Sequence, residues 1–203
     1  MNILLLSTIY PLPDKGNKGT PVCHYFAREW VKMGHDVRVV HYQAVYPAPF
    51  YWAARIARNR IIAKTSAVVY TERDKGGIYE MDNVPIMRVP LFKPIPHGKF
   101  WKSSITRSID SIVEWLSNSE FLPDLIIGHF PNPQIEVVSR LKIIWPQAHS
   151  VIVMHLPREN GDIKRIYGKR FKAMSDKIDT WGFRNEPLRK LFVKEIMPVK
   201  HGF

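Results

Sequence analysis

Short runs of almost wholly apolar residues recur along this chain and alternate with segments that have the spacing of amphipathic helices. The ranges 3–6, 123–130 and 149–155 contain such runs, each too short to form a helix of ordinary length. Strands that are apolar on both faces are typical of parallel sheets, in which helices cover each side. The alternation therefore predicts an α/β fold, with three α/β/α layers built around a mainly parallel sheet. We expect one domain over residues 1–203, because no linker interrupts the pattern.

Local signals predict the boundaries of several elements. Thr20 is a suitable N-cap and Pro21 a suitable first residue for the helix that follows the first strand. The two glycines at 76–77 predict the turn of a hairpin. A further helix is expected over 163–175, and the prolines of 92–102 indicate a loop there.

The chain is strongly basic. Its 30 Lys and Arg residues against 18 Asp and Glu give a formal net charge of +12 and a pI near 9.9. Such a balance indicates an anionic partner, which could be nucleic acid, a phosphorylated ligand or an acidic membrane surface. Charge alone does not choose among the three.

Other features narrow the class of protein. Cys23 is the only cysteine, which excludes an internal disulfide and a cysteine-rich zinc site. Six histidines lack the spacing of metal ligands, so no metal is expected at them: His24, His35, His41, His97, His149 and His201. No other cofactor is expected either. No apolar run is long enough to span a bilayer, and the first residues lack the pattern of a signal peptide. We therefore expect a cytoplasmic protein.

The stretch "DKGNKGTPV", 14–22, follows the first strand and has the composition of an anion-binding loop. Ligands of parallel sheets bind beyond the carboxyl ends of the strands, and a helix N-terminus there offers unpaired N–H groups to an anion. Gly16 and Gly19 would let the backbone approach a phosphate closely. The pattern is neither a Walker A motif nor G-x-G-x-x-G, and the second strand ends in "HYQ" without an acidic residue for a ribose. A plain connecting loop with a good helix cap remains the alternative.

Four segments, in order, resemble the N-terminal domain of the family 4 (group 1) retaining glycosyltransferases, which have the GT-B fold. They are "PLPDKGNKGTPVCHYFAREWVKMGHDVRVV", "PDLIIGHF", "SVIVMHLPRENGDI" and "DTWGFRNEPLRKLF". The range 44–102 matches no motif of that family. The resemblance implies that residues 1–203 form a Rossmann-like, acceptor-side domain, and that the C-terminal donor-binding domain is absent from this chain.

The resemblance also implies an activity. The full-length enzyme would be a hexosyltransferase that moves a sugar from a nucleotide-sugar donor to a glycan or lipid-linked acceptor, in polysaccharide or glycolipid biosynthesis. The isolated chain would be inactive. Two other functions stay open: a non-catalytic nucleotide-binding module of Rossmann type, and a basic nucleic-acid-binding domain.

Carried over to this chain, the resemblance places Gly16, Gly19 and Thr20 near the donor diphosphate. It makes His129 the catalytic residue, in contact with the transferred sugar or the acceptor at the reaction centre. A histidine at a strand end can hydrogen-bond a hydroxyl or stabilise charge near a leaving phosphate. The alternative is a histidine that only packs or caps the end of its strand.

Three further residues are candidates for acceptor binding: His155, Asp162 and Arg184. His155 ends a strand, and the charged residues after it could equally form a solvated loop. Arg184 could bind an anion through its guanidinium fork. It could equally pair with Glu186 or cap a helix.

Two stretches, 50–64 and 92–102, combine aromatic and basic residues as an anionic lipid surface requires. From them we predict membrane contacts, which are Trp52, Arg55, Arg58, Arg60 and Trp101. The protein would then be cytoplasmic and peripheral on the inner face of the cell membrane. Core aromatics beside a solvated basic face are the alternative. Single-stranded nucleic acid would use the same residue types, but no nucleic-acid-binding motif is present, so no nucleic acid is expected.

Overall fold

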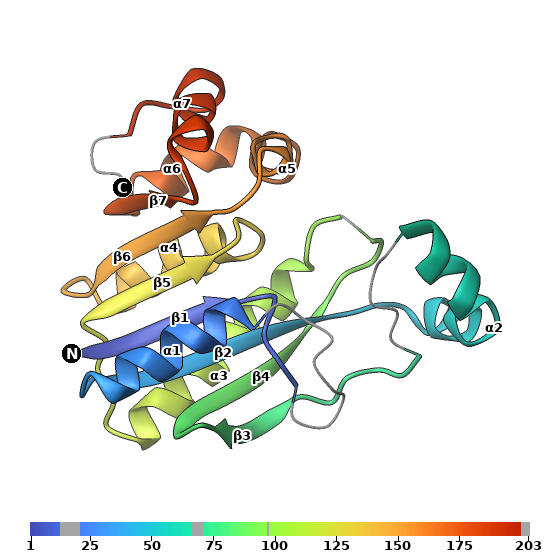
Figure 1. Ribbon diagram of the computed structural model, residues 1–203, viewed down its shortest axis with the longest axis horizontal. Helices are drawn as coiled ribbons and strands as arrows, with labels where there is room; N and C mark the ends of the chain where they lie inside the picture. The colour runs from blue at the N-terminus through green and yellow to red at the C-terminus, as the bar shows by residue number, and fades with distance from the viewer. Residues whose placement is uncertain (13–20, 66–70, 97, 200–203) are drawn as a thin grey trace.

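A seven-stranded sheet runs through the middle of the molecule, in the strand order β3-β4-β2-β1-β5-β6-β7 (Figure 1). The computed structural model describes residues 1–12, 21–65, 71–96 and 98–199, with the side chains of all of these except 61–65. The strands are β1 (Asn2–Ser7), β2 (Asp36–Val45), β3 (Gly77–Met81), β4 (Val84–Phe92), β5 (Leu125–His129), β6 (His149–Met154) and β7 (Thr180–Phe183). Only β3 pairs in the antiparallel direction, and the other described strands are parallel.

Helices cover the two faces of this sheet. They are α1 (Val22–Lys32), α2 (Ala48–Thr65), α3 (Lys102–Asn118), α4 (Gln134–Ile144), α5 (Arg158–Tyr167), the short 3₁₀ helix η1 (Gly168–Arg170), α6 (Phe171–Ser175) and α7 (Glu186–Glu195). In Figure 1, α1 lies in front of the sheet and α3 and α4 lie behind it, whereas α2 stands beyond the carboxyl ends of the strands. The predicted three-layer α/β fold with a mainly parallel sheet is confirmed.

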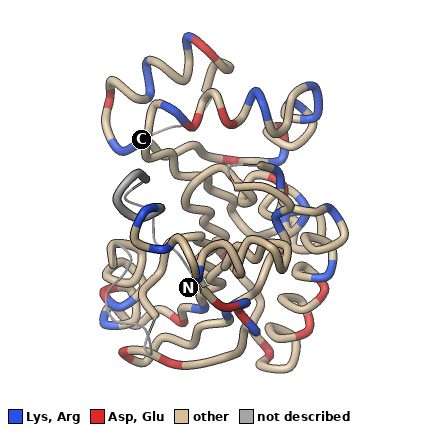
Figure 2. The backbone as a smooth tube through the Cα atoms, turned by 90° about the vertical axis from the view of Figure 1, so that its right-hand side faces the viewer, with Lys and Arg blue, Asp and Glu red and all other residues tan. Residues whose placement is uncertain are grey.

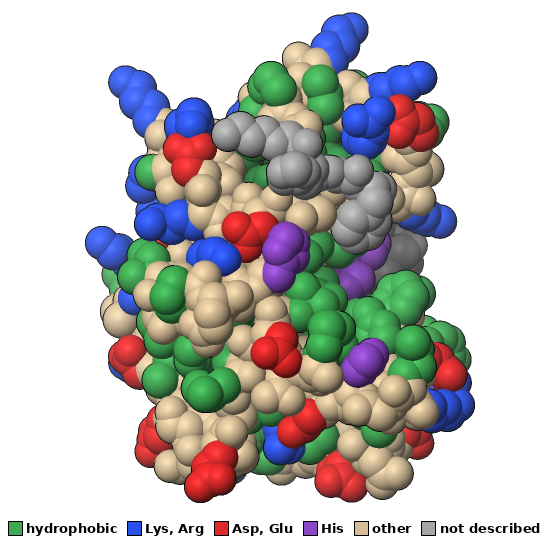
Figure 3. Space-filling model, turned by 90° about the vertical axis from the view of Figure 1, so that its left-hand side faces the viewer, with side chains coloured by type: hydrophobic (Ala, Val, Ile, Leu, Met, Phe, Trp, Pro, Cys, Tyr) green, Lys and Arg blue, Asp and Glu red, His purple; other side chains and the backbone are tan. Residues whose placement is uncertain are grey.

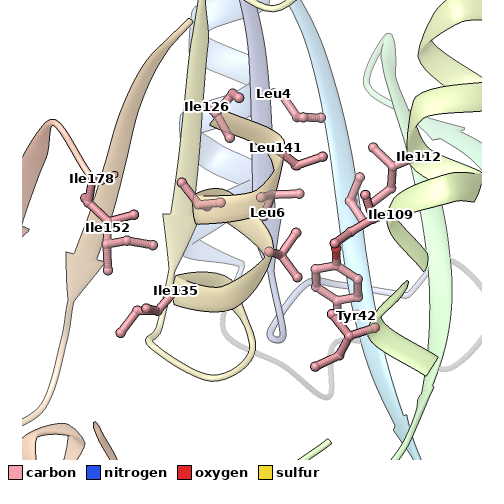
Figure 4. Close-up of a cluster of buried hydrophobic side chains, with 14 of the residues drawn as sticks. Leu4, Leu6, Tyr42, Ile109, Ile112, Ile126, Ile135, Leu141, Ile152 and Ile178 are labelled. Carbon is pink, nitrogen blue, oxygen red and sulfur yellow. The ribbon is translucent and has the colours of Figure 1, made fainter. Parts of the chain in front are cut away.

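The middle of β1 is apolar because both of its faces are buried. Successive side chains of a strand point to opposite faces, so the two halves of β1 enter different clusters. Leu4 and Leu6 pack on the side of α3 and α4, whereas Ile3 and Leu5 pack on the side of α1 with Ala27. Figure 4 shows the larger cluster, which includes Tyr42, Ile109, Ile112, Ile126, Ile135, Leu141 and Ile152.

The hairpin of β3 and β4 turns at a different place from the one predicted. The prediction of a turn at 76–77 is wrong, because those glycines directly precede or begin β3. The turn is Asp82-Asn83, between the paired residues Met81 and Val84. Both turn residues have positive φ, 51° and 60°. Two-residue hairpins of type I′ require this backbone, and Asp and Asn tolerate it better than most residues.

Two predicted helix boundaries are also wrong. Helix α1 begins at Val22, with Pro21 in the N-cap position, and the predicted cap Thr20 lies outside the described residues. The helix predicted over 163–175 begins earlier, at Arg158, and is interrupted at Gly168. Gly168 has a φ of 51°, a conformation that ends an α-helix and that glycine adopts at little cost.

The strand order reverses beside β1. From β1 the chain builds the sheet outward through β2 and β4, then returns through α3 to place β5 on the other side of β1. In open α/β sheets, ligands bind at such a reversal, beyond the carboxyl ends of the strands. The last residues of β1 and β5, Ser7 and His129, are neighbours at this point.

Candidate functional site

Two histidines meet at the carboxyl edge of the sheet, next to the reversal. His129 is the last residue of β5 and His155 directly follows β6, the adjacent strand. The Nδ1 atom of His129 lies 2.9 Å from the Nε2 atom of His155, a hydrogen-bond distance. The structure thus brings together two of the residues singled out from the sequence, which we call the histidine pair.

The histidine pair is held in its neutral form. His129 is only 3% exposed, and this burial, followed by the influence of His155, lowers the pKa of His129 to about 3. Burial and then the nearby charge of Arg184 lower the pKa of His155 below its usual value. Near pH 7 one ring therefore donates the shared proton and the other accepts it. This bond determines what Nε2 of His129 can do. When Nδ1 accepts the hydrogen bond, Nε2 carries the ring proton and can donate it to a ligand. When Nδ1 donates, Nε2 can accept a hydrogen bond.

Aromatic rings enclose the pair on both sides. Phe26 of α1 stacks against His129 with ring centroids 6.0 Å apart, and Phe130 stacks against His155 at 4.4 Å. The backbone of Phe130 has a φ of 72°, and its N–H donates to the carbonyl of Val153 at 3.1 Å. The chain therefore turns sharply as it leaves β5, and the turn places the Phe130 ring over His155.

Glu159 is a site residue that the sequence analysis missed. It lies in the first turn of α5, is 4% exposed, and its Oε2 accepts the backbone N–H of His155 at 2.8 Å. Burial raises the pKa of this carboxyl group. The loop after β6 is therefore ordered around a buried acid rather than solvated. A signal was present, since an acidic residue in the first turn of a helix is favoured by the helix dipole.

A cavity of about 240 Å³ opens beside Phe130 at the same edge, and we call it the edge cavity. Its lining comes from the segments that follow β1, β4, β5 and β6. Lys93 and Arg158 contribute positive charge, and burial lowers the pKa of Lys93. The predicted acceptor residue Asp162 also lines the cavity, and its carboxylate pairs with Arg165. A cavity with mixed charge at this edge suits a small polar ligand.

Arg184 follows β7 and lies exposed near His155. Its N–H donates to the carbonyl of Met154 at 3.1 Å, which fixes the backbone at this point. Neither structural alternative suggested from the sequence applies. Glu186 pairs with Arg189, and Asn185 caps α7 by accepting the N–H of Leu188. Within the described part of the chain, the Arg184 side chain takes part in no ion pair.

The close approach of α4 to β5 also shapes this edge. A Cβ atom added to Gly128 would lie 2.8 Å from Cβ of Gln134 and 2.8 Å from Cδ1 of Ile152. Only glycine fits there without displacing its neighbours. Gly128 therefore lets α4 pack directly beneath the strand end that carries His129.

The structure does not describe some of the predicted site residues. Gly16, Gly19 and Thr20, the predicted phosphate loop, lie outside the described residues. Over the ranges that the structure describes, no group of three His, Cys, Asp or Glu residues could hold a metal ion. In the same ranges, no helix is long and apolar enough to cross a membrane.

The predicted membrane residues are on the surface. Trp52 is 69% exposed and Trp101 is 56% exposed, and Ile56, which the sequence analysis did not single out, is 70% exposed. Arg58 and Arg60 are exposed, whereas Nε of Arg55 donates to the carbonyl of Thr71 at 3.1 Å. Four of the five predicted residues, together with Ile56, lie on α2, which stands beyond the sheet in Figure 1.

Basic residues are spread along the described part of the chain. Figure 2, which looks toward the carboxyl edge and α2, shows Lys and Arg distributed over most of the chain. Figure 3 shows the opposite edge, where acidic and basic side chains both appear. A stripe of positive charge, the usual footprint of nucleic-acid binding, is not evident in these views.

The sequence matches no protein-family model and no curated protein. Two solved structures share the fold. One is an α,α-trehalose-phosphate synthase (UDP-forming) from Burkholderia xenovorans in complex with glucose-6-phosphate, with 10% identity and a TM-score of 0.51. The other is the apo structure of OtsA, with 9% identity and a TM-score of 0.53. The alignments cover 96% and 95% of this chain but only 43% and 42% of those chains. The likeness shows the fold alone, and this chain spans less than half the length of each of those two chains.

Proposed function

We propose that this chain is the acceptor-binding domain of a retaining glycosyltransferase of family 4. The observation that carries the proposal is the neutral histidine pair, which lies beside the reversal of a sheet with the fold of a GT-B domain. The enzyme would move a hexose from a nucleotide-sugar donor to a glycan or lipid-linked acceptor. A second, donor-binding domain would complete it.

The site has the chemistry that a sugar hydroxyl requires. A neutral imidazole can donate or accept a hydrogen bond without bringing a charge to a carbohydrate, and burial keeps His129 in this form. Preorganised hydrogen-bonding groups in a site with little water contribute more than they would in solution. The edge cavity would hold part of the acceptor against Lys93 and Arg158.

The two alternative functions fit less well. A module that binds a nicotinamide dinucleotide would normally have an acidic residue at the end of the second strand, but β2 ends in Gln43-Ala44-Val45. A nucleic-acid-binding domain would use a continuous basic surface, and the one side of the molecule that Figure 3 shows has acidic side chains among the basic ones. Both remain outcomes of the experiment below.

Saturation-transfer NMR on the 203-residue chain tests the proposal. We expect saturable signals from a neutral glycan or a polyprenyl-linked sugar, with shifts of the His129 and His155 ring resonances. Nucleotide sugars should bind feebly, because one domain supplies only one wall of their site. Binding of a nucleotide without any sugar would favour the nucleotide-binding module, and binding of an oligonucleotide would favour the nucleic-acid-binding domain.

We also propose that the chain cannot turn over substrate by itself. Holding donor and acceptor together supplies about 7–11 kcal/mol of the lowering of the barrier in such reactions. To test this proposal, the purified chain is mixed with candidate donors and acceptors, and the release of nucleotide is followed. Sustained release without a second polypeptide would contradict the division into two domains.

Helix α2 is the proposed membrane contact. Trp52 and Ile56 expose apolar surface, and Arg55, Arg58 and Arg60 lie on the same helix. Aromatic and basic side chains together suit an anionic lipid surface, where each basic residue contributes about 1 kcal/mol.

The chain should therefore co-sediment with vesicles that contain phosphatidylglycerol, and salt should release it. Replacing Arg55, Arg58 and Arg60 by Gln should weaken binding about 100-fold, if each side chain contributes about 1 kcal/mol. A control variant removes three exposed lysines elsewhere, Lys164, Lys169 and Lys190, and so has the same net charge. Equal binding to neutral vesicles, or an equal loss in the control, would refute α2 as the contact.

A further inference from the structure

A second and larger cavity, of about 620 Å³, lies beyond the carboxyl ends of β2 and β4 and against the first three turns of α3. We call it the α3 cavity. Val45 and Phe92, the last residues of these strands, form part of its wall. It has no lining residue in common with the edge cavity. Its volume is in the range of small-molecule sites, about 300–1,000 Å³.

The α3 cavity is positively charged. Arg73, Lys75 and Arg107 line it, and Asp74 is the one acidic residue in its described lining. The Asp74 carboxylate is 6% exposed and pairs with Arg88, so its charge is already compensated. Within the described part of the chain, Arg73, Lys75 and Arg107 take part in no ion pair. Three positive charges around a concave wall concentrate the field inside it and attract an anion.

Hydroxyl groups of α3 complete the wall. Ser104, Ser108 and Ser111 recur at helical spacing, so they share one side of the helix with Arg107. Ser104 and Ser108 are 7% and 3% exposed. The Ser104 Oγ accepts the N–H of Phe92 at 3.0 Å, which leaves its hydroxyl proton for a second partner. The Ser108 hydroxyl already donates to the carbonyl of Ile105 at 2.7 Å, so Ser104 is the buried serine of this wall that can donate to a ligand beside the cations.

We propose that the α3 cavity binds the phosphate group of an acceptor, which is either a soluble sugar phosphate or a phospholipid headgroup. This inference rests on the proposed function and names the chemical class of its acceptor. The phosphate monoester of a sugar phosphate carries about −1.5 to −2 charges at pH 7, and the phosphodiester of a lipid headgroup carries a single negative charge. The three cations of the α3 cavity can compensate either group. The guanidinium forks of Arg73 and Arg107 can each hold two phosphate oxygens. The volume leaves room for the organic part of the ligand.

Calorimetric titration of the 203-residue chain with inorganic phosphate tests this inference. We expect one saturable site whose affinity falls as salt rises. Arg107→Gln and Lys75→Gln should each weaken phosphate binding at least tenfold. Both side chains are exposed, so these variants should fold. The matched control is Lys190→Gln on α7, which should bind phosphate as the parent chain does. Absence of saturable binding, or an equal loss in the control, would overturn the inference.

Two further arms identify the source of the phosphate. Tighter binding of glucose 6-phosphate than of inorganic phosphate, lost in Arg107→Gln, would assign a soluble sugar phosphate. Binding to phosphatidylglycerol vesicles that requires Arg107, with no gain for glucose 6-phosphate, would assign a lipid headgroup. Either result supports the α3 cavity as a phosphate site.

Failure of this inference can be told apart from failure of the proposed function. The proposed function is tested by neutral sugars at the histidine pair, whereas this inference is tested by phosphate at Arg107. If phosphate binds at the α3 cavity but no sugar binds, the transferase proposal fails and the phosphate site stands. If sugars bind and phosphate does not, only the present inference fails.

Discussion

In an enzyme that joins this chain to a donor-binding domain, His129→Ala is expected to lower kcat/KM by about 100-fold or more. The variant removes a neutral imidazole at the carboxyl edge of the sheet, where the reacting sugar would lie. An interaction made mainly in the transition state lowers kcat and kcat/KM together when it is lost. Steady-state kinetics with saturating donor would measure both values.

Two comparisons separate this role from a purely structural one. His129 is buried, so we expect the alanine variant to be less stable as well. His129→Gln keeps a polar side chain there and should restore most of the stability but little of the activity. His149→Ala changes an exposed histidine at the start of β6, and its turnover should match that of the parent enzyme. Normal turnover in either His129 variant would refute the assignment.

Acid is expected to destabilise the chain well above the pH at which carboxyl groups titrate. Burial, followed by the charge of Arg88, lowers the pKa of His41 to about 3, and burial lowers that of His129 to about 3. Both take up a proton near pH 6.5 once the chain unfolds, so the unfolded state binds more protons between pH 6.5 and 3. The contribution of these two histidines to the free energy of unfolding is therefore fully present above pH 6.5, and it is lost as the pH decreases through this window.

The expected loss is a substantial fraction of the free energy of unfolding of a domain of ordinary size. Between pH 8 and pH 5 each buried histidine contributes a loss of about 2 kcal/mol, and the two together about 4 kcal/mol. The lowered pKa of His155 adds to this loss, whereas burial raises the pKa of Glu159 and acts in the opposite direction. Domains have a free energy of unfolding of about 5–15 kcal/mol, so urea denaturation at several pH values would detect the change easily.

A single substitution checks the origin of this pH dependence. The Nδ1 atom of His41 is buried and has no partner among the described residues, so His41→Leu should be tolerated and should reduce the loss by about 2 kcal/mol. The matched control, His35→Gln, alters a more exposed histidine and should retain the full loss. A free energy of unfolding that stays constant from pH 8 to pH 5 would contradict the prediction.

The sheet was predictable from the sequence because strands that are buried on both faces appear as short, continuous apolar runs. Strand β1 needs Ile3 and Leu5 for one layer and Leu4 and Leu6 for the other, so no polar residue interrupts it. The hairpin turn was not predictable in the same way. Gly-Gly is a stronger turn signal than Asp-Asn, but the pairing of Met81 with Val84 places the turn at Asp82-Asn83. Pairing between strands outweighed the local preference.

The candidate site was predictable residue by residue but not as an arrangement. His129 and His155 each follow an apolar run, which places both at the carboxyl edge. Their contact depends on β5 and β6 being neighbours in register, which a single sequence does not state. The burial of Glu159 and the α3 cavity depend on how helices pack over the sheet, so neither has a signature in residue spacing.

The central position of β1 has a consequence for the order in which the chain is made. One edge of β1 pairs with β2, but its other edge pairs only with β5, which begins 80 residues after the end of β2, from Val45 to Leu125. At about 5–20 residues per second, the ribosome needs roughly 4–16 s to cover that interval. An unpaired strand edge is a template for association with other chains. The most protected strand of the finished sheet therefore spends seconds of its synthesis as an exposed edge, where a nascent-chain chaperone would find its main target.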